Sequence, residues 1–76
     1  MKNKIIEILT EIRPEFNFNI ESKDFFSKGI LDSFDIISIV SDLEDIFGLE
    51  IDGAKILPEN FDSVEAIFNL MDENNE

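Results

Sequence analysis

One stretch decides the fold of this chain: residues 33–48, which read SFDIISIVSDLEDIFG. At about 100° per residue, the apolar side chains of this stretch cover about half of a helical wheel. These side chains are Ile36, Ile37, Ile39, Val40, Leu43, Ile46 and Phe47. A stripe this wide is typical of a central helix that packs against two or three neighbours. Gly48 is expected to end the helix, because glycine readily adopts the left-handed conformation that closes many helices.

Two further stretches have the apolar spacing of helices, one near each end of the chain. Each places apolar residues at positions i, i+3, i+4 and i+7, which form one face of a helix. The two faces consist of Ile5, Ile8, Leu9 and Ile12 in the first stretch, and of Val64, Ile67, Phe68 and Met71 in the last. Pro14 disfavours helical geometry at Arg13, so the first helix is expected to end there. The last helix is expected to begin with a capping box in which Asp62 is the N-cap and Glu65 its partner.

Residues 14–32 form a long connection without helical or strand periodicity. Loops of this length in small domains are usually functional or anchored by their own side chains. The apolar residues available as anchors are Phe16, Phe18, Ile20, Phe25, Phe26, Ile30 and Leu31. Residues 24–27 are expected to form a single helical turn, and Gly29 a turn just before the middle helix.

The segment after the middle helix, residues 49–61, predicts one short additional helix. Leu49 and Ile51 are expected to be buried, and Pro58 suits the first position of a short helix near residues 57–61. No strand pattern and no internal repeat is present in the sequence. The predicted fold class is all-α: a small bundle of three to four helices with a long loop between the first and second main helices. The length of 76 residues predicts a single domain over residues 1–76.

The composition argues against most enzymatic chemistry. The chain contains no Cys and no His, so it lacks disulfides, the usual zinc ligands and an imidazole base. Asp32 and Asp35 could in principle act as an acid–base pair, but carboxylates at i and i+3 are far more often features of a helix start. The acidic residues between positions 42 and 52 do not follow the spacing of a calcium-binding loop. We therefore expect no catalytic residue, no metal site and no enzymatic activity.

The net charge of −12 arises entirely from the second part of the chain. Residues 1–28 contain five acidic and five basic side chains, whereas residues 29–76 contain thirteen acidic side chains and one basic side chain, Lys55. A surface of one sign attracts a basic partner and speeds association with it. It also argues against nucleic acid and anionic membranes as direct partners. With no signal peptide and no apolar run of membrane-spanning length, we expect a cytoplasmic monomer without membrane insertion.

The junction before the middle helix, GILDSFD at residues 29–35, is the most informative segment for function. A serine at the start of a helix commonly acts as an N-cap, and replacing such a cap by Ala costs about 1 kcal/mol. The hydroxyl of Ser33 is also accessible to another protein, and the free N–H groups of a helix start favour a phosphate attached there. Phe34 falls in the polar sector of the wheel, which indicates either a partner contact or a first turn covered by the preceding loop.

In this order, these features resemble the acyl carrier proteins and the related peptidyl and D-alanyl carrier domains. The resemblance covers essentially the whole chain. It rests on the aromatic-rich loop, on the Asp32-Ser33 pair, and on the stretches LEDIFG at 43–48, LEI at 49–51 and NFDSV at 60–64. The run GILDS at 29–33 is more similar to D-alanyl carriers and to free-standing carriers served by an adenylating ligase than to fatty-acid synthase carriers. Phe34 departs from the Leu or Met that is usual after the serine, which bears on the choice of transferase or ligase.

The resemblance implies that Ser33 carries a phosphopantetheine group, transferred from coenzyme A by a phosphopantetheinyl transferase. The thiol of this arm would hold an acyl or aminoacyl group as a thioester, in fatty-acid, aminoacyl or secondary-metabolite biosynthesis. The further partners implied are an adenylating acyl or aminoacyl ligase and an acyltransferase or synthase. The partner-binding residues implied are Asp32, Phe34, Asp35, Ser38, Ser41, Asp42, Glu44 and Asp45.

The residues alone leave open a function of a different class, a non-catalytic acidic interaction module. Such a module would mimic DNA or regulate a basic partner, and it would use the same negative charge. Replacement of Asp42 and Asp45 should impair either function. Replacement of Ser33 should impair only a carrier, because an interaction module needs no accessible hydroxyl there.

Overall fold

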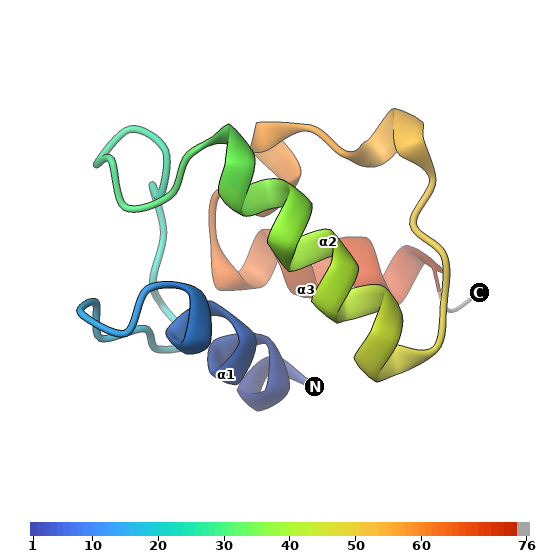
Figure 1. Cartoon of the computed structure of the whole chain (residues 1–76), viewed down its shortest axis with the longest axis horizontal. Helices are drawn as coiled ribbons and strands as arrows, with labels where there is room; N and C mark the ends of the chain where they lie inside the picture. The colour runs from blue at the N-terminus through green and yellow to red at the C-terminus, as the bar shows by residue number, and fades with distance from the viewer. Residues whose placement is uncertain (75–76) are drawn as a thin grey trace.

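The computed structural model describes residues 1–74, and its longest helix, α2 (Ser33–Phe47), is the predicted middle helix. The N-terminal helix α1 (Lys2–Ile12) packs against both α2 and the C-terminal helix α3 (Val64–Asn74). Two short 3₁₀ helices, η1 (Gly53–Lys55) and η2 (Pro58–Phe61), follow α2, and η2 packs against α2 and α3. Figure 1 shows α2 crossing in front of α3, with the long loop leading from α1 to the start of α2. The all-α prediction is confirmed for the described residues.

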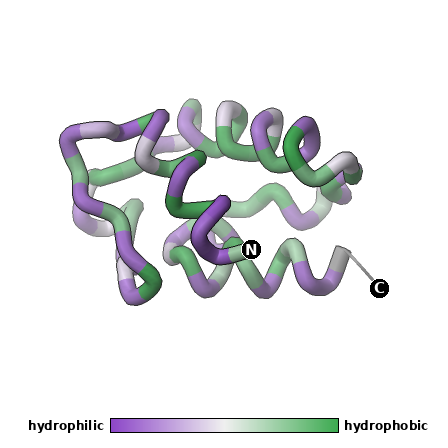
Figure 2. Tube along the Cα trace, turned by 90° about the horizontal axis from the view of Figure 1, so that it is seen from below, coloured by the Kyte–Doolittle hydropathy of each residue, from purple (hydrophilic) through white to green (hydrophobic). Residues whose placement is uncertain are grey.

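Apolar side chains from the three helices and from the connecting segments form one hydrophobic core. The buried members are Ile5, Ile8, Leu9, Phe18, Phe25, Leu31, Ile36, Ile39, Val40, Leu43, Ile51, Phe61, Val64, Ile67, Leu70 and Met71. Figure 2 shows hydrophobic and hydrophilic residues alternating along the helices, as expected when each helix buries one face. The predicted faces of α1 and α3 are confirmed, although Ile12 and Phe68 are only half-buried.

The buried face of α2 is narrower than the sequence predicts. Ile37 is 67% exposed and Ile46 is 48% exposed, so the expectation that both face the core is wrong. The physical reason is that α2 packs mainly against α1 and η2, which together cover only one side of the helix.

The ends of α1 and α2 lie where the sequence places them. Gly48 follows α2 in the left-handed conformation, with φ of 64°, and its N–H group donates to the carbonyl of Glu44. Arg13 is the C-cap of α1, and its N–H group donates to the carbonyl of Leu9 at 2.9 Å. Pro14 then prevents continuation of the helix, in agreement with the prediction.

The long loop is fastened to the start of α3. The N–H of Phe25 donates to the carbonyl of Asp62 at 3.1 Å, and the N–H of Phe26 donates to the Asp62 carboxylate at 3.0 Å. The N–H of Val64 donates in turn to the carbonyl of Ser22 at 3.2 Å. These bonds bring the end of the loop, and with it the start of α2, into a defined position relative to the core.

Of three local expectations for this region, two are wrong and one is confirmed. The carboxylate of Asp62 bonds to the loop, so the cap of α3 is Ser63, whose Oγ accepts from the N–H of Ala66 at 2.9 Å. The expected single helical turn is present, because the N–H of Lys28 donates to the carbonyl of Asp24 at 3.0 Å and closes one turn there. Ile20 does not anchor the loop, because it is 52% exposed.

Gly48 and Gly53 offer a matched pair of substitutions. A Cβ atom at either position would contact nothing within 4 Å, but only Gly48 has a positive φ. We expect Gly48→Ala to lower the free energy of unfolding by about 1–2 kcal/mol, the usual cost of a left-handed backbone at a residue with a Cβ. Gly53→Ala should leave it unchanged or raise it slightly, because alanine restricts the unfolded chain. Urea unfolding of both variants measures the difference, and equal stabilities would contradict this account of how α2 ends.

Candidate functional site at the start of alpha 2

The first turn of α2 is held by a reciprocal capping box between two aspartates. Asp32 is the N-cap, and its Oδ1 accepts from the N–H groups of Phe34 at 2.9 Å and Asp35 at 3.1 Å. Asp35 completes the box, because its Oδ2 accepts from the N–H of Asp32 at 2.9 Å. Three N–H groups at the helix start are thus satisfied by side chains of this junction.

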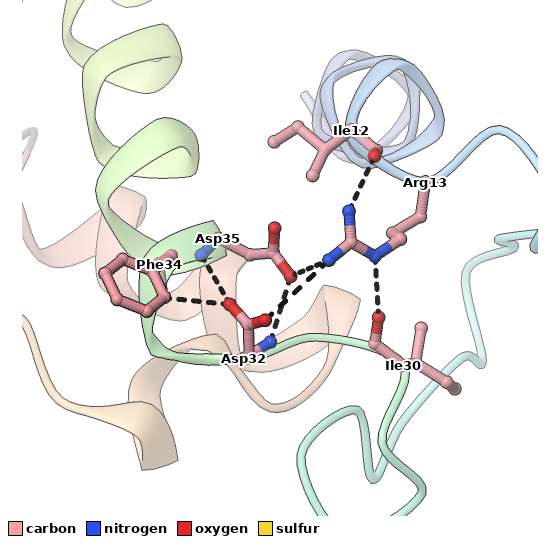
Figure 3. A network of polar contacts seen from close by, with 6 residues as sticks. All are labelled: Ile12, Arg13, Ile30, Asp32, Phe34 and Asp35. Atoms are coloured by element: carbon pink, nitrogen blue, oxygen red, sulfur yellow. Dashed lines mark hydrogen bonds and ion pairs between the residues drawn. The ribbon is translucent and has the colours of Figure 1, made fainter.

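The guanidinium group of Arg13 joins this capping box to the end of α1 (Figure 3). Its Nη2 donates to Asp35 Oδ2 at 2.6 Å and lies 4.0 Å from Asp32 Oδ2. Its Nε donates to the carbonyl of Ile30 at 3.2 Å, and its Nη1 donates to the carbonyl of Ile12 at 3.1 Å. One side chain therefore connects the end of α1, the end of the loop and the first turn of α2.

The expectation that Asp35 belongs to the exposed polar sector of α2 is wrong. Asp35 is only 7% exposed, and its carboxylate bonds to Arg13 and to the backbone of Asp32. A buried carboxylate is stable when it is paired and hydrogen-bonded, which explains why an acidic residue is tolerated at this position.

The hydroxyl of Ser33 lies outside this network. Ser33 is the first residue of α2 and is exposed, and its hydroxyl has no hydrogen-bond partner among residues 1–74. The cap of α2 is Asp32, so the geometry excludes Ser33 as the cap. The loss of about 1 kcal/mol of stability that is typical of removing a cap is therefore not expected for Ser33. Ser33 thus combines an exposed hydroxyl with neighbours on both sides whose backbone N–H groups are hydrogen-bonded.

An exposed apolar surface lies directly beside Ser33. Phe34 is 79% exposed and Ile37 is 67% exposed, so the preceding loop does not cover the first turn. At about 100° per residue, positions three and four apart share a helix face, which places Ile37, Ser38 and Ser41 around Phe34. Both serines are exposed, as predicted.

The predicted acidic residues of α2 differ in their availability to a partner. Asp45 is exposed and Asp42 half-buried, and within residues 1–74 neither forms an ion pair. Glu44 is half-buried, and its Oε2 accepts from the N–H of Ile51 at 2.9 Å, so its carboxylate holds the segment after α2. Asp42 and Asp45 are the carboxylates of this face that are free to attract a basic surface.

Lys55, the one basic residue after position 28, is paired away from α2. Its Nζ donates to Glu73 Oε2 at 2.9 Å. This hydrogen bond and the charge of Glu73 raise the pKa of Lys55 above its ordinary value, and the charge of Asp52 acts in the same direction. The lysine therefore stays charged at neutral pH and contacts the C-terminal helix.

Sequence reasoning did not identify two residues of this site. Arg13 was expected only to end the first helix, although it is the single arginine of the chain and precedes a proline. The helical wheel places Ile37 in the core; the sequence signal against that placement is its spacing of three residues from Phe34, which the sequence leaves either exposed to a partner or covered by the loop.

The described part of the chain offers few other chemical sites. Residues 1–74 contain no group of three or more acidic side chains arranged to hold a metal ion, and no pocket is found in them. None of the helices among these residues has the length and apolar character needed to cross a lipid bilayer. No family model, curated protein or solved structure matches this chain.

Asp32 and Ser33 are neighbours with opposite structural roles, which a pair of alanine substitutions tests. Asp32→Ala removes the N-cap and should lower the free energy of unfolding by about 1 kcal/mol. Ser33→Ala removes an exposed hydroxyl without a partner, and it should change stability by less than about 0.5 kcal/mol. Chemical denaturation followed by circular dichroism gives both values. A loss in Ser33→Ala as large as that in Asp32→Ala would contradict the assignment of the cap.

Proposed function

We propose that this chain is a free-standing carrier protein and that Ser33 Oγ is the attachment point of a phosphopantetheine group. The observation that carries the proposal is the exposed hydroxyl at the start of α2, which has no hydrogen-bond partner among residues 1–74. Asp32 already caps the helix, so this hydroxyl can be modified without the loss of a contact of the fold. The resemblance of the sequence to carrier domains supports Ser33 as the modified residue.

The residues around Ser33 fit a phosphodiester at this position. The positive end of the helix dipole favours an anion there. Arg13 neutralises one of the two neighbouring carboxylates, which reduces the repulsion that a further anion would meet. The chain contains no Cys. A bound phosphopantetheine group supplies the thiol that holds an acyl or aminoacyl group as a thioester.

Loading of the carrier is a single substitution at phosphorus. Ser33 Oγ forms a bond to the coenzyme A phosphorus nearest the pantetheine, and the bond from that phosphorus to the bridging oxygen of the pyrophosphate breaks. Adenosine 3′,5′-bisphosphate leaves with the bridging oxygen. The proton of the Ser33 hydroxyl passes to a base supplied by the transferase. The role of this chain is to present the hydroxyl at a defined and accessible position.

The surface beside Ser33 suits an enzyme with an apolar recess bordered by basic side chains. Phe34 and Ile37 supply the exposed apolar area, and Asp42 and Asp45 supply carboxylates without an ion pair in the described residues. Complementary charge of this kind speeds encounter and orients the partners. The partners that we propose are a phosphopantetheinyl transferase, an adenylating acyl or aminoacyl ligase, and an acyltransferase or synthase in the cytoplasm.

Incubation with coenzyme A and a transferase of broad specificity tests the proposal directly. We expect the intact mass of the protein to rise by one phosphopantetheine, and Ser33→Ala to abolish the increase. Ser27→Ala is the control, because Ser27 is an exposed serine of the loop and lies outside the partner-binding residues, and this variant should be loaded like the unmodified chain.

Two results would overturn the proposal: no mass increase in the unmodified chain, or an increase that persists in Ser33→Ala. The first result would favour the acidic interaction module, which needs the negative charge but no reactive hydroxyl.

A further inference from the structure

We infer that Arg13 is the positioning residue for Ser33: it holds the junction between the loop and α2 in the geometry in which the hydroxyl is loaded. The inference rests on the proposed carrier function. Arg13 does not touch Ser33, and its effect is exerted through the residues on either side of the serine. It assigns a functional role to a residue of a different helix, twenty positions earlier in the chain.

The contacts of Arg13 converge on the backbone that flanks Ser33. Before the serine, the guanidinium group binds the carbonyl of Ile30 at 3.2 Å. After the serine, it binds the carboxylate of Asp35 at 2.6 Å, and that same Oδ2 atom accepts from the N–H of Asp32 at 2.9 Å. Asp35 Oδ2 thus lies between the guanidinium group and the backbone of the residue that precedes Ser33.

Within residues 1–74, the Ser33 hydroxyl has no hydrogen bond that would fix its direction. The backbone of residues 30–35, which Arg13 and the capping box hold, fixes the Cα and Cβ of Ser33 and so limits the positions that Oγ can reach. Arg13 is the C-cap of α1, so its bonds to Ile30 and Asp35 tie this junction to the end of α1, and its bond to the carbonyl of Ile12 orients the guanidinium group. Without the Arg13 side chain, the junction would keep the local capping box but lose these hydrogen bonds to the end of α1.

The geometry requires an arginine and not simply a positive charge. A planar guanidinium group donates in several fixed directions, and here it serves two carbonyls and one carboxylate from three segments of the chain. A lysine ammonium would preserve the charge beside the aspartates, but it cannot reproduce this set of directions. Arg13→Lys therefore separates the positioning of the junction from its electrostatics.

The kinetic signature follows from where Arg13 lies. Phe34, Ile37 and Asp45 are exposed along α2, and Arg13 binds none of them. Docking of a transferase on this face should be preserved in Arg13 variants, so KM should stay within about twofold of the unmodified value. Misplacement of the attacking oxygen lowers the rate of the chemical step, and we expect kcat to fall about tenfold or more.

The experiment measures kcat and KM for transfer of phosphopantetheine to the full chain, with intact mass as the readout. The variants are Arg13→Lys and Arg13→Gln, each shown to be folded by circular dichroism at the assay temperature. Ile67→Val is the control, because it trims a buried side chain of α3 and weakens the fold away from this junction. Amide hydrogen exchange at residues 30–35 gives an independent measure of whether the junction has loosened.

The inference predicts a lower kcat with an unchanged KM in both Arg13 variants, faster exchange at residues 30–35, and normal kinetics in Ile67→Val. It is overturned if kcat is unchanged in Arg13→Lys, if Ile67→Val lowers kcat as much, or if KM carries the whole effect. Failure of both Arg13 variants to fold would also overturn it, since Arg13 would then be needed for the fold itself. If the unmodified chain is not loaded, both the proposed function and this inference fail. If the unmodified chain is loaded and the Arg13 variants have the same kinetics, only this inference fails.

Discussion

The ion pair between Arg13 and Asp35 is the contact on which the rest of the site depends. It joins the end of α1 to the first turn of α2, with 2.6 Å between Arg13 Nη2 and Asp35 Oδ2. Asp35 Oδ2 also accepts from the N–H of Asp32 and so completes the capping box. Because Asp35 is buried, loss of its partner would leave an uncompensated charge at a helix start. The arrangement leaves one exposed polar side chain at the junction without an internal partner, the hydroxyl of Ser33.

Most of the fold could be predicted from the spacing of apolar residues and from residues that stop helices. Pro14 and Gly48 act through backbone geometry alone, which is why the ends of α1 and α2 agree with expectation. Ile37 and Ile46 could not be placed correctly from a helical wheel, because their exposure depends on how much of α2 the neighbouring elements cover. The cap of α3 depends on a contact between Asp62 and Phe26, which are far apart in the chain.

The candidate site was predictable in part for the same reasons. The position of Ser33 at a loop–helix junction follows from local sequence, whereas the sequence leaves open whether the loop covers Phe34. Local sequence does not show which of two adjacent polar residues caps the helix, since Asp32 and Ser33 are both good capping residues. The burial of Asp35 and the role of Arg13 could not be read from the sequence, because they arise when α1 is brought against α2.

The central claim is that the Ser33 hydroxyl serves as a covalent tether and not as part of the scaffold. The most direct test is the mass of the protein isolated from the cells that naturally produce it, followed by fragmentation of the peptide that contains residues 29–35. The account predicts that a fraction of the molecules carries one phosphopantetheine, located on Ser33. Native protein that is wholly unmodified at Ser33, or modified only at another residue, would contradict it.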